Sequence, residues 1–173
     1  MTIGKKMNDA LNGQINEEIF SAYLYFAMAA DFEVKDWPGV ASWMKIQAQE
    51  EMGHALKIYN WINERGGKAV FAAIEKPQES WETALELFEG ALEHEQHITS
   101  CFYNLVKIAR DEGDISAEIF LQWFVTEQVE EEANASEIVG KIKKVKDSQN
   151  GMYMLDKELS VRSAAPVQSE SQS

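Results

Sequence analysis

The stretch QAQEEMGHALK, residues 47–57, has a helical pattern with a carboxylate and an imidazole among its apolar residues. Glu51 and His54 stand three positions apart, so both fall on one face of a helix. Apolar residues between Met44 and Ile62 recur on that same face with the 3.6-residue period. Glutamate is almost never fully buried unless it is paired. The stretch therefore predicts a helix that turns charged groups toward its own core, where they need a partner.

The composition indicates an all-α, globular chain. Of its 173 residues 45% are hydrophobic, and only three are proline. The net charge of −13 argues against a nucleic-acid partner, because no basic surplus is present to neutralise phosphates. No apolar run reaches the roughly 18 residues of a membrane span, and the N-terminus lacks a signal-peptide pattern. The single cysteine, Cys101, rules out an internal disulfide and a four-cysteine metal site. We predict a cytoplasmic protein that does not bind a membrane.

Helical periodicity predicts four long helices and a short fifth one. They cover about residues 5–32, 38–65, 81–110 and 115–145, followed by MYMLDKELS (152–160) after a break at SQNG. The first glycine of the Gly66-Gly67 pair is expected to end the second helix, and Ser80 to cap the third.

The connection at residues 66–80 is long for a helix bundle and can span a whole helix. We therefore expect the third helix to run parallel to the second. The short turn DEGD (111–114) makes the fourth antiparallel to the third. The prediction is an all-α four-helix bundle with a long crossover between helices two and three, formed by residues 1–162. Residues 163–173 are expected to be a disordered tail.

Every long helix has glutamate on its apolar stripe. These residues are Glu18, Glu51, Glu95, Glu127 and Glu131. Several buried carboxylates repel one another and raise each other's pKa. The predicted stripes contain no lysine or arginine, so a bound cation is the remaining compensation. Oxygen ligands with one imidazole suit iron, manganese or zinc. The alternatives are a misjudged helix phase and glutamates that simply face water.

Five stretches of the chain resemble the non-haem ferritins of bacteria and archaea. They are NEEIFSAYLYFAMA (16–29), QAQEEMGHA (47–55), EHEQHIT (93–99), FLQWFVTEQVEEE (120–132) and LDKELS (155–160). The resemblance extends from about residue 7 to residue 162. It implies a ferritin-like bundle in which a dinuclear iron site oxidises Fe(II) with dioxygen or hydrogen peroxide.

The resemblance also implies which residues bind iron. Glu18, Glu51 and His54 match the ligands of the first iron. Glu51 is expected to bridge to a second iron, which Glu95 and Glu131 complete.

Further residues match groups beside the two iron ions. Gln128 matches a glutamine next to the second iron, and Tyr25 matches a tyrosine packed near the site. A third iron position of the prokaryotic ferritins combines Glu131 with three more glutamates. These are Glu50, Glu127 and Glu130.

One departure and one match bear on the comparison with relatives that bind haem. Ferritin-like di-iron bundles often have a second Glu-x-x-His motif, and Glu130 stands here in place of its histidine. Met52 stands where bacterioferritins bind haem, but a methionine there can simply pack at a subunit contact, and we expect no haem. His94 and His97 flank Glu95 and are interpreted as polar surface or subunit-contact residues.

The resulting hypothesis is an iron storage protein with ferroxidase activity, self-associated into a hollow shell of 24 subunits. The first alternative is a stand-alone di-iron oxidoreductase, for instance a peroxidase, that stores no mineral. The second is a metal-free helical scaffold, against which the inward-facing glutamates count.

Overall fold

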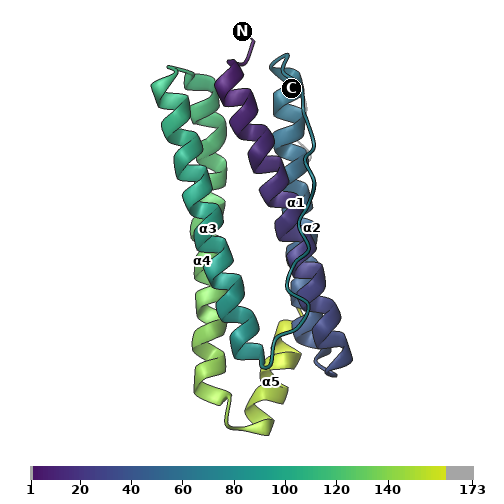
Figure 1. Ribbon diagram of the computed structural model, residues 1–173. Helices are drawn as coiled ribbons and strands as arrows, with labels where there is room; N and C mark the ends of the chain where they lie inside the picture. The colour runs from purple at the N-terminus through teal and green to yellow at the C-terminus, as the bar shows by residue number, and fades with distance from the viewer. Residues whose placement is uncertain (1, 163–173) are drawn as a thin grey trace.

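The computed structural model describes residues 2–162, which form a bundle of helices (Figure 1). The helices are α1 (Lys5–Val34), α2 (Pro38–Glu64), α3 (Ala84–Asp111), α4 (Ile115–Val145) and α5 (Gln149–Leu159). No strand occurs within residues 2–162. The predicted all-α bundle with a short fifth helix is confirmed, whereas the predicted tail lies outside the described residues.

The crossover between α2 and α3, residues 65–83, runs the length of the bundle beside α1 and α2 (Figure 1). Consequently α3 starts at the end of the bundle where α2 starts, and α4 returns beside α3 in the opposite direction. Asn8 and Asn12 of α1 hold the start of the crossover, because their side-chain amides donate to the Lys68 carbonyl at 3.2 and 3.0 Å. The predicted parallel course of helices two and three is confirmed.

Helix α2 ends at the glycine pair, as predicted. Gly66 has a φ of 66°, in the left-handed region that favours glycine. The N–H groups of Gly66 and Gly67 donate to the carbonyls of Asn63 and Ile62 at 3.0 and 2.9 Å. This pair of bonds is the Schellman arrangement, which satisfies the last carbonyls of the helix.

Two predicted helix starts are wrong by a few residues. Helix α3 begins at Ala84, where the hydroxyl of Thr83 accepts the Glu86 N–H at 3.1 Å; Ser80 does not cap it. Helix α5 begins at Gln149 rather than at 152, because Ser148 accepts the Gly151 N–H at 3.1 Å and starts the helix inside the SQNG stretch. In both cases several side chains could cap a helix, and local geometry selects one of them.

The fifth helix packs on the beginning of α2. The Asp156 carboxylate accepts the backbone N–H of Val40 at 2.9 Å, so α5 supplies a cap for the first turn of α2. Gly39 allows the contact, since a Cβ at this position would stand 1.7 Å from the Asp156 carbonyl oxygen.

The core consists of two apolar clusters, one toward each end of the bundle. One joins the end of α1, the start of α2 and α3, the end of α4, and α5; Phe32, Met44, Phe88 and Ile142 belong to it. The other joins the start of α1, the end of α2 and α3, and the start of α4. The inward-facing glutamates lie between these clusters along every long helix.

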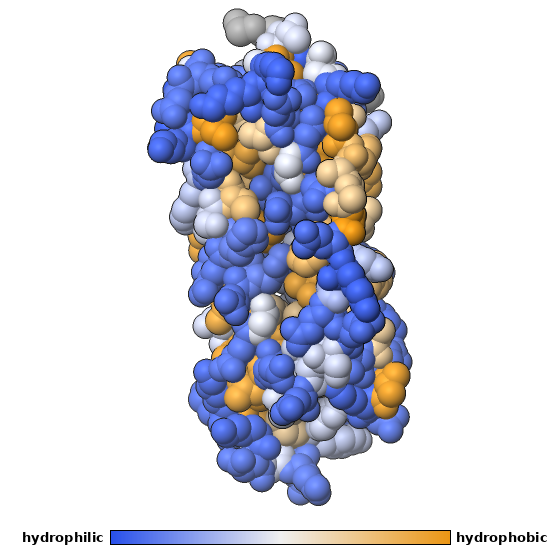
Figure 2. All heavy atoms as spheres, in the orientation of Figure 1, coloured by the Kyte–Doolittle hydropathy of each residue, from blue (hydrophilic) through white to orange (hydrophobic). Residues whose placement is uncertain are grey.

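The exterior is mainly polar on the face drawn in Figure 2, where hydrophobic side chains form scattered patches. Within residues 2–162, no helix combines the length and the apolar character needed to cross a membrane.

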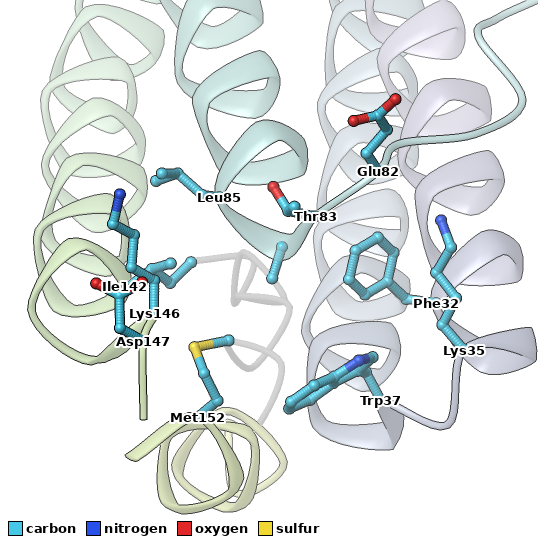
Figure 3. Close-up of a pocket in the computed structure, with 11 residues that line it drawn as sticks. Phe32, Lys35, Trp37, Glu82, Thr83, Leu85, Ile142, Lys146, Asp147 and Met152 are labelled. Carbon is cyan, nitrogen blue, oxygen red and sulfur yellow. The ribbon is translucent and has the colours of Figure 1, made fainter. Parts of the chain in front are cut away.

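A cavity of about 450 Å³ lies at the α5 end of the bundle (Figure 3). Phe32, Trp37, Thr83, Ile142 and Met152 are among the residues that line it. None of the predicted iron ligands lines this cavity, so it is separate from the predicted metal site inside the bundle.

Candidate metal centre

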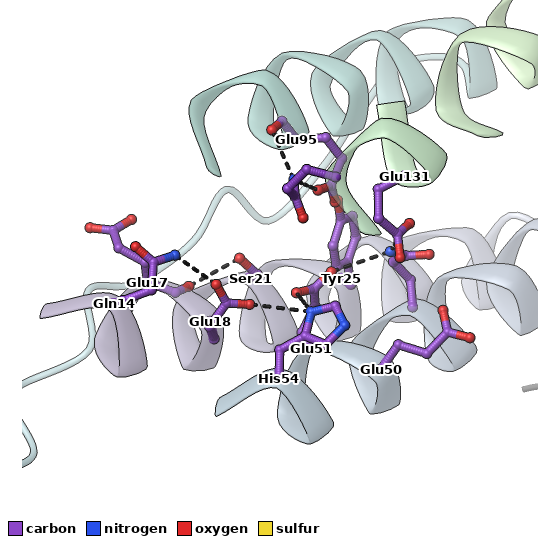
Figure 4. A network of polar contacts seen from close by, with 12 residues as sticks. Gln14, Glu17, Glu18, Ser21, Tyr25, Glu50, Glu51, His54, Glu95 and Glu131 are labelled. Atoms are coloured by element: carbon purple, nitrogen blue, oxygen red, sulfur yellow. Dashed lines mark hydrogen bonds and ion pairs between the residues drawn. The ribbon is translucent and has the colours of Figure 1, made fainter. Parts of the chain in front are cut away.

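Glu18 of α1 meets Glu51 and His54 of α2 in the interior of the bundle (Figure 4). The Nδ1 atom of His54 lies 3.2 Å from Glu51 Oε2 and 3.4 Å from Glu18 Oε2. One potential ligand atom from each of the three residues lies within 4.8 Å of the others. The structure therefore brings together the three residues predicted to bind the first iron.

Glu95 of α3 and Glu131 of α4 reach toward Glu51 and Tyr25 from the other side (Figure 4). The Tyr25 hydroxyl donates to Glu95 Oε1. Gln128 donates from Nε2 to Glu95 Oε2 at 3.0 Å. All five residues are buried, so the predicted second group of ligands also faces the interior, and Tyr25 and Gln128 orient Glu95.

Two glutamines that sequence reasoning missed hold these carboxylates in place. Gln14 donates from Nε2 to Glu18 Oε1 at 2.7 Å. Gln47 donates from Nε2 to Glu51 Oε1 at 3.2 Å and to Glu131 Oε2 at 2.7 Å, and so joins α2 to α4. Each glutamine precedes a stripe glutamate by four residues, and this spacing could have identified both of them.

One carboxylate oxygen in the cluster is left without a hydrogen bond. Glu18 Oε2 is fully buried and has no hydrogen-bond partner among the described residues; it has only the longer ion-pair contact with His54. An unsatisfied buried acceptor costs about 1–3 kcal/mol, and more when it is charged. A cation placed between Glu18, Glu51 and His54 would satisfy this oxygen.

The buried carboxylates have strongly raised pKa values. Burial raises the pKa of Glu51 to about 7, and the charge of Glu18 adds to the effect. Burial raises the pKa of Glu95 to about 8, assisted by the charge of Glu51. The pKa of Glu131 also rises to about 8, through burial and the charges of Glu95 and Glu51. Negative charge on these buried carboxylates is therefore unfavourable unless bound protons or metal ions neutralise it.

His54, unlike these carboxylates, is stabilised in its charged form. Burial lowers its pKa, but the adjacent carboxylates of Glu18 and Glu51 outweigh burial, so the pKa of His54 stands well above its usual value. In the metal-free protein the imidazolium thus partly takes the place of a bound cation.

The residues predicted for a third iron lie at the margin of the centre. Glu127 is half-buried and Glu130 is exposed. Burial raises the pKa of Glu127. The negative charges of Glu130 and Glu50 raise it further, so both carboxylates interact electrostatically with Glu127. Glu131 alone of the predicted set is buried with the main cluster.

Arg162, just after α5, provides a positive charge that sequence reasoning missed. Its Nη2 atom binds Glu50 Oε2 at 2.5 Å, and Nη1 donates to Gln47 Oε1 at 2.8 Å. The guanidinium also stacks over the Trp43 ring, 4.3 Å from its centroid. No helical period relates Arg162 to the stripes, because it reaches the site only through the docking of α5.

His94 is partly buried rather than a solvated surface residue, whereas its predicted alternative role at a subunit contact stays a prediction. It is largely enclosed by the rings of Phe20 and Tyr25, and its Nε2 atom lies 2.7 Å from the hydroxyl of Ser21. Burial lowers the pKa of His94 to about 4, so the imidazole is neutral and lies beside Tyr25. His97 is exposed, as expected.

Comparison with known proteins agrees with this architecture. The ferritin-like domain family matches residues 8–145. Bacterial non-heme ferritin from Staphylococcus aureus (strain MRSA252) is 41% identical over 160 residues, which cover 92% of this chain and 96% of that protein. The namesake from Staphylococcus saprophyticus is 41% identical over 161 residues, covering 93% and 96%.

A solved structure shows the same arrangement of helices. The open pore ferritin from the hyperthermophilic archaeon Archaeoglobus fulgidus superposes with a TM-score of 0.93 at 44% identity, covering 94% of this chain and all of that one. An engineered closed form of the same ferritin also gives 0.93, at 44% identity over 95% of this chain. These matches span all four glutamate-bearing helices, and the chain therefore belongs to the ferritin family.

Proposed function

We propose that this ferritin-family protein stores iron and oxidises Fe(II) at the buried centre before storage. Iron storage is the general function of the family. The observation that supports oxidation at this place is the burial of carboxylates from four helices in one layer, with Glu18 and Glu51 beside the His54 imidazole and Glu18 Oε2 left unsatisfied. Such a donor set suits iron among the transition metals, and iron is the metal that the family stores.

In this proposal Fe(II) is the substrate. Glu18 and His54 bind the first ion, Glu51 bridges both ions, and Glu95 and Glu131 bind the second. Binding displaces the protons that Glu51, Glu95 and Glu131 hold near neutral pH, since a cation and a proton compete for the same oxygens. Tyr25 and Gln128 keep Glu95 in position by hydrogen bonding, as groups around a metal commonly do.

An external oxidant accepts the electrons that the Fe(II) ions give up. Each Fe(II) gives up one electron, and dioxygen accepts two electrons and two protons to form hydrogen peroxide. If hydrogen peroxide is the oxidant, it accepts two electrons and two protons and yields two water molecules. Carboxylates suit both oxidation states of iron, so one ligand set can hold the substrate and release the product.

A third iron position is proposed at Glu50, Glu127 and Glu130, together with Glu131. The side chains of Glu50, Glu127 and Glu130 are more open to water than the main cluster. An ion leaving the buried centre could therefore pause there. No haem is proposed, and Met52 is taken as a contact residue that is 38% exposed in the isolated chain.

We further propose that the chain assembles into a hollow shell of 24 subunits that receives the ferric mineral. The similarity to the open pore ferritin of Archaeoglobus fulgidus supports this assembly. Large apolar side chains exposed on the helices supply surface for subunit contacts; among them are Tyr23, Phe26, Leu56 and Tyr103. The net charge of −13 per subunit would attract Fe(II) to the shell.

The proposal is tested by adding Fe(II) in air to the purified protein and following ferric absorbance and oxygen uptake. Glu18→Ala and His54→Ala are expected to slow rapid oxidation by at least about tenfold, because each removes a metal ligand. Glu93→Ala, an exposed change on α3, is the matched control and should oxidise iron at the native rate. Native-rate oxidation by either ligand variant would overturn the assignment.

Size-exclusion chromatography separates storage from the stand-alone alternative. The storage proposal requires a 24-subunit mass for the native protein and for both variants. A monomer or dimer with full oxidase activity would instead support a di-iron oxidoreductase without a shell.

A further inference from the structure

A second group of potential metal ligands lies between α1 and α3, and it shares no residue with the buried centre. Glu17 of α1 faces His97 and Cys101 of α3, and one ligand atom from each lies within 4.8 Å of the others. His97 is exposed and the other two are partly buried. His97 and Cys101 stand four positions apart, one helical turn, so their side chains share a face of α3.

A single imidazole atom of His97, Nε2, lies close to both Glu17 and Cys101. This atom lies 3.2 Å from Glu17 Oε2 and 3.6 Å from Cys101 Sγ. An imidazole nitrogen has one hydrogen or one lone pair in the ring plane, so it can satisfy one of the two neighbours but not both. A cation in front of Nε2 could contact all three ligand atoms at once.

The separations agree with tetrahedral coordination. Zinc bonds of about 2.0 Å to nitrogen or oxygen and about 2.3 Å to sulfur place the nitrogen and oxygen ligands roughly 3.3 Å apart, and the nitrogen and sulfur ligands roughly 3.5 Å apart. The observed values of 3.2 and 3.6 Å match these. The distance between Cys101 and Glu17 is at most 4.8 Å, and the partly exposed glutamate can shift to shorten it.

We propose that Glu17, His97 and Cys101 bind a divalent cation of the zinc class, with water in the fourth coordination position. The thiolate and imidazole favour such a borderline-soft ion over magnesium or calcium, which prefer oxygen ligands alone. Three protein ligands and one open position form a site that solvent can reach. The site is independent of the iron-oxidising centre proposed above.

Cobalt titration of the assembled, chelator-treated protein tests the site. Co²⁺ is the probe, because a cobalt–thiolate bond gives a charge-transfer band in the near ultraviolet. Cys101 is the sole cysteine in the chain, so the band reports this site even when cobalt also fills the buried centre. The native protein is expected to show the band, and Cys101→Ser to lose it.

Variants of the other ligands sharpen the test. His97→Ala should weaken cobalt binding in this band by at least about tenfold, as expected for a lost ligand. His54→Ala, which removes a ligand of the buried centre on α2, should keep the band, so failure of one proposal is distinguishable from failure of the other. No thiolate band at excess Co²⁺, or an unchanged affinity in His97→Ala, would overturn the inference.

Alkylation of Cys101 by iodoacetamide provides a second measurement. Zn²⁺ is expected to slow the reaction at least about tenfold in the native protein, because a metal-bound thiolate is a poorer nucleophile and is sterically covered. Mg²⁺ should give no protection. Equal protection by Mg²⁺, or undiminished protection by Zn²⁺ in His97→Ala, would contradict the site.

Discussion

Replacing Glu131 by glutamine should stabilise the metal-free protein at alkaline pH while weakening its metal centre. Glutamine has nearly the same shape, and its carbonyl oxygen can still accept the hydrogen bond that Gln47 donates to Glu131 at 2.7 Å. The substitution therefore removes the charge and keeps the packing. Burial and the charges of Glu95 and Glu51 raise the pKa of Glu131 from 4.5 to about 8.

The sign of the effect follows from proton linkage. A carboxyl with a raised pKa keeps its proton in the folded state at a pH where the unfolded chain has lost it. The resulting stability is complete below pH 4.5 and is lost as the pH rises to about 8. A rise in pKa of this size corresponds to at most about 5 kcal/mol. Glu51 and Glu95 act in the same direction, so the free energy of unfolding of the native metal-free protein should fall across this range.

Urea denaturation of chelator-treated protein, followed by circular dichroism at about pH 5 and about pH 8, measures the difference. The protein concentration must be held constant, because assembly contributes to stability. Glu131→Gln should match the native protein at the lower pH and exceed it at the higher pH. Glu137→Gln, an exposed change on the same helix, is the control and should change stability far less than Glu131→Gln at the higher pH, because solvent screens an exposed charge.

Two results would refute the reasoning. One is a native metal-free protein whose stability does not fall between these pH values. The other is a Glu131→Gln variant that is no more stable than the native protein at the higher pH. A redox-inactive cation such as Zn²⁺ should reverse the order at the higher pH, since it stabilises the native centre by binding and finds one carboxylate fewer in the variant.

The remaining predictions concern the docking of α5 and the margin of the centre. Asp156→Ala should cost about 1 kcal/mol in urea denaturation through loss of a helix cap. Gly39→Ala should be more damaging, because its Cβ would meet the Asp156 carbonyl at 1.7 Å. Arg162→Gln should tighten Mn²⁺ binding at the third position severalfold in calorimetry, because it removes the cation beside Glu50; unchanged affinity would contradict a competing role. Glu130→Gln should weaken that position and leave the fast phase of iron oxidation intact in stopped-flow absorbance; equal loss of both would contradict the division between them.

The inward direction of the glutamates could be predicted from the sequence because the helices are long. Over several turns the 3.6-residue period determines which positions face inward, and Glu95 has buried apolar residues on both sides, Phe88 and Ile98 among them. Leu92, which the same period places on this stripe, is only partly buried. Periodicity averages over such local deviations, so it predicts a helix face better than it predicts a single side chain.

Contacts between distant parts of the chain could not be predicted in this way. Asp156 meets Val40 across 116 positions, and Arg162 meets Glu50 across 112. Both contacts depend on where α5 docks on the bundle, which no local pattern encodes. His94, one position off the stripe, is predicted to be a polar surface or subunit-contact residue. Its burial depends on the approach of Phe20 from the neighbouring helix.

The position of the centre along the helices explains how a fold can keep so many carboxylates inside. The polar layer lies between two apolar clusters that use residues from all four long helices. Burial of those clusters contributes roughly 25 cal/mol for each Å² of apolar surface removed from water, and this outweighs the cost of a few protonated or metal-bound acids. Residues in the middle of a long helix also keep their backbone hydrogen bonds, so metal can enter or leave without any helix end having to open. A layer at the end of the bundle would have one cluster to support it instead of two, and its ligands would be positioned by helix ends that fray.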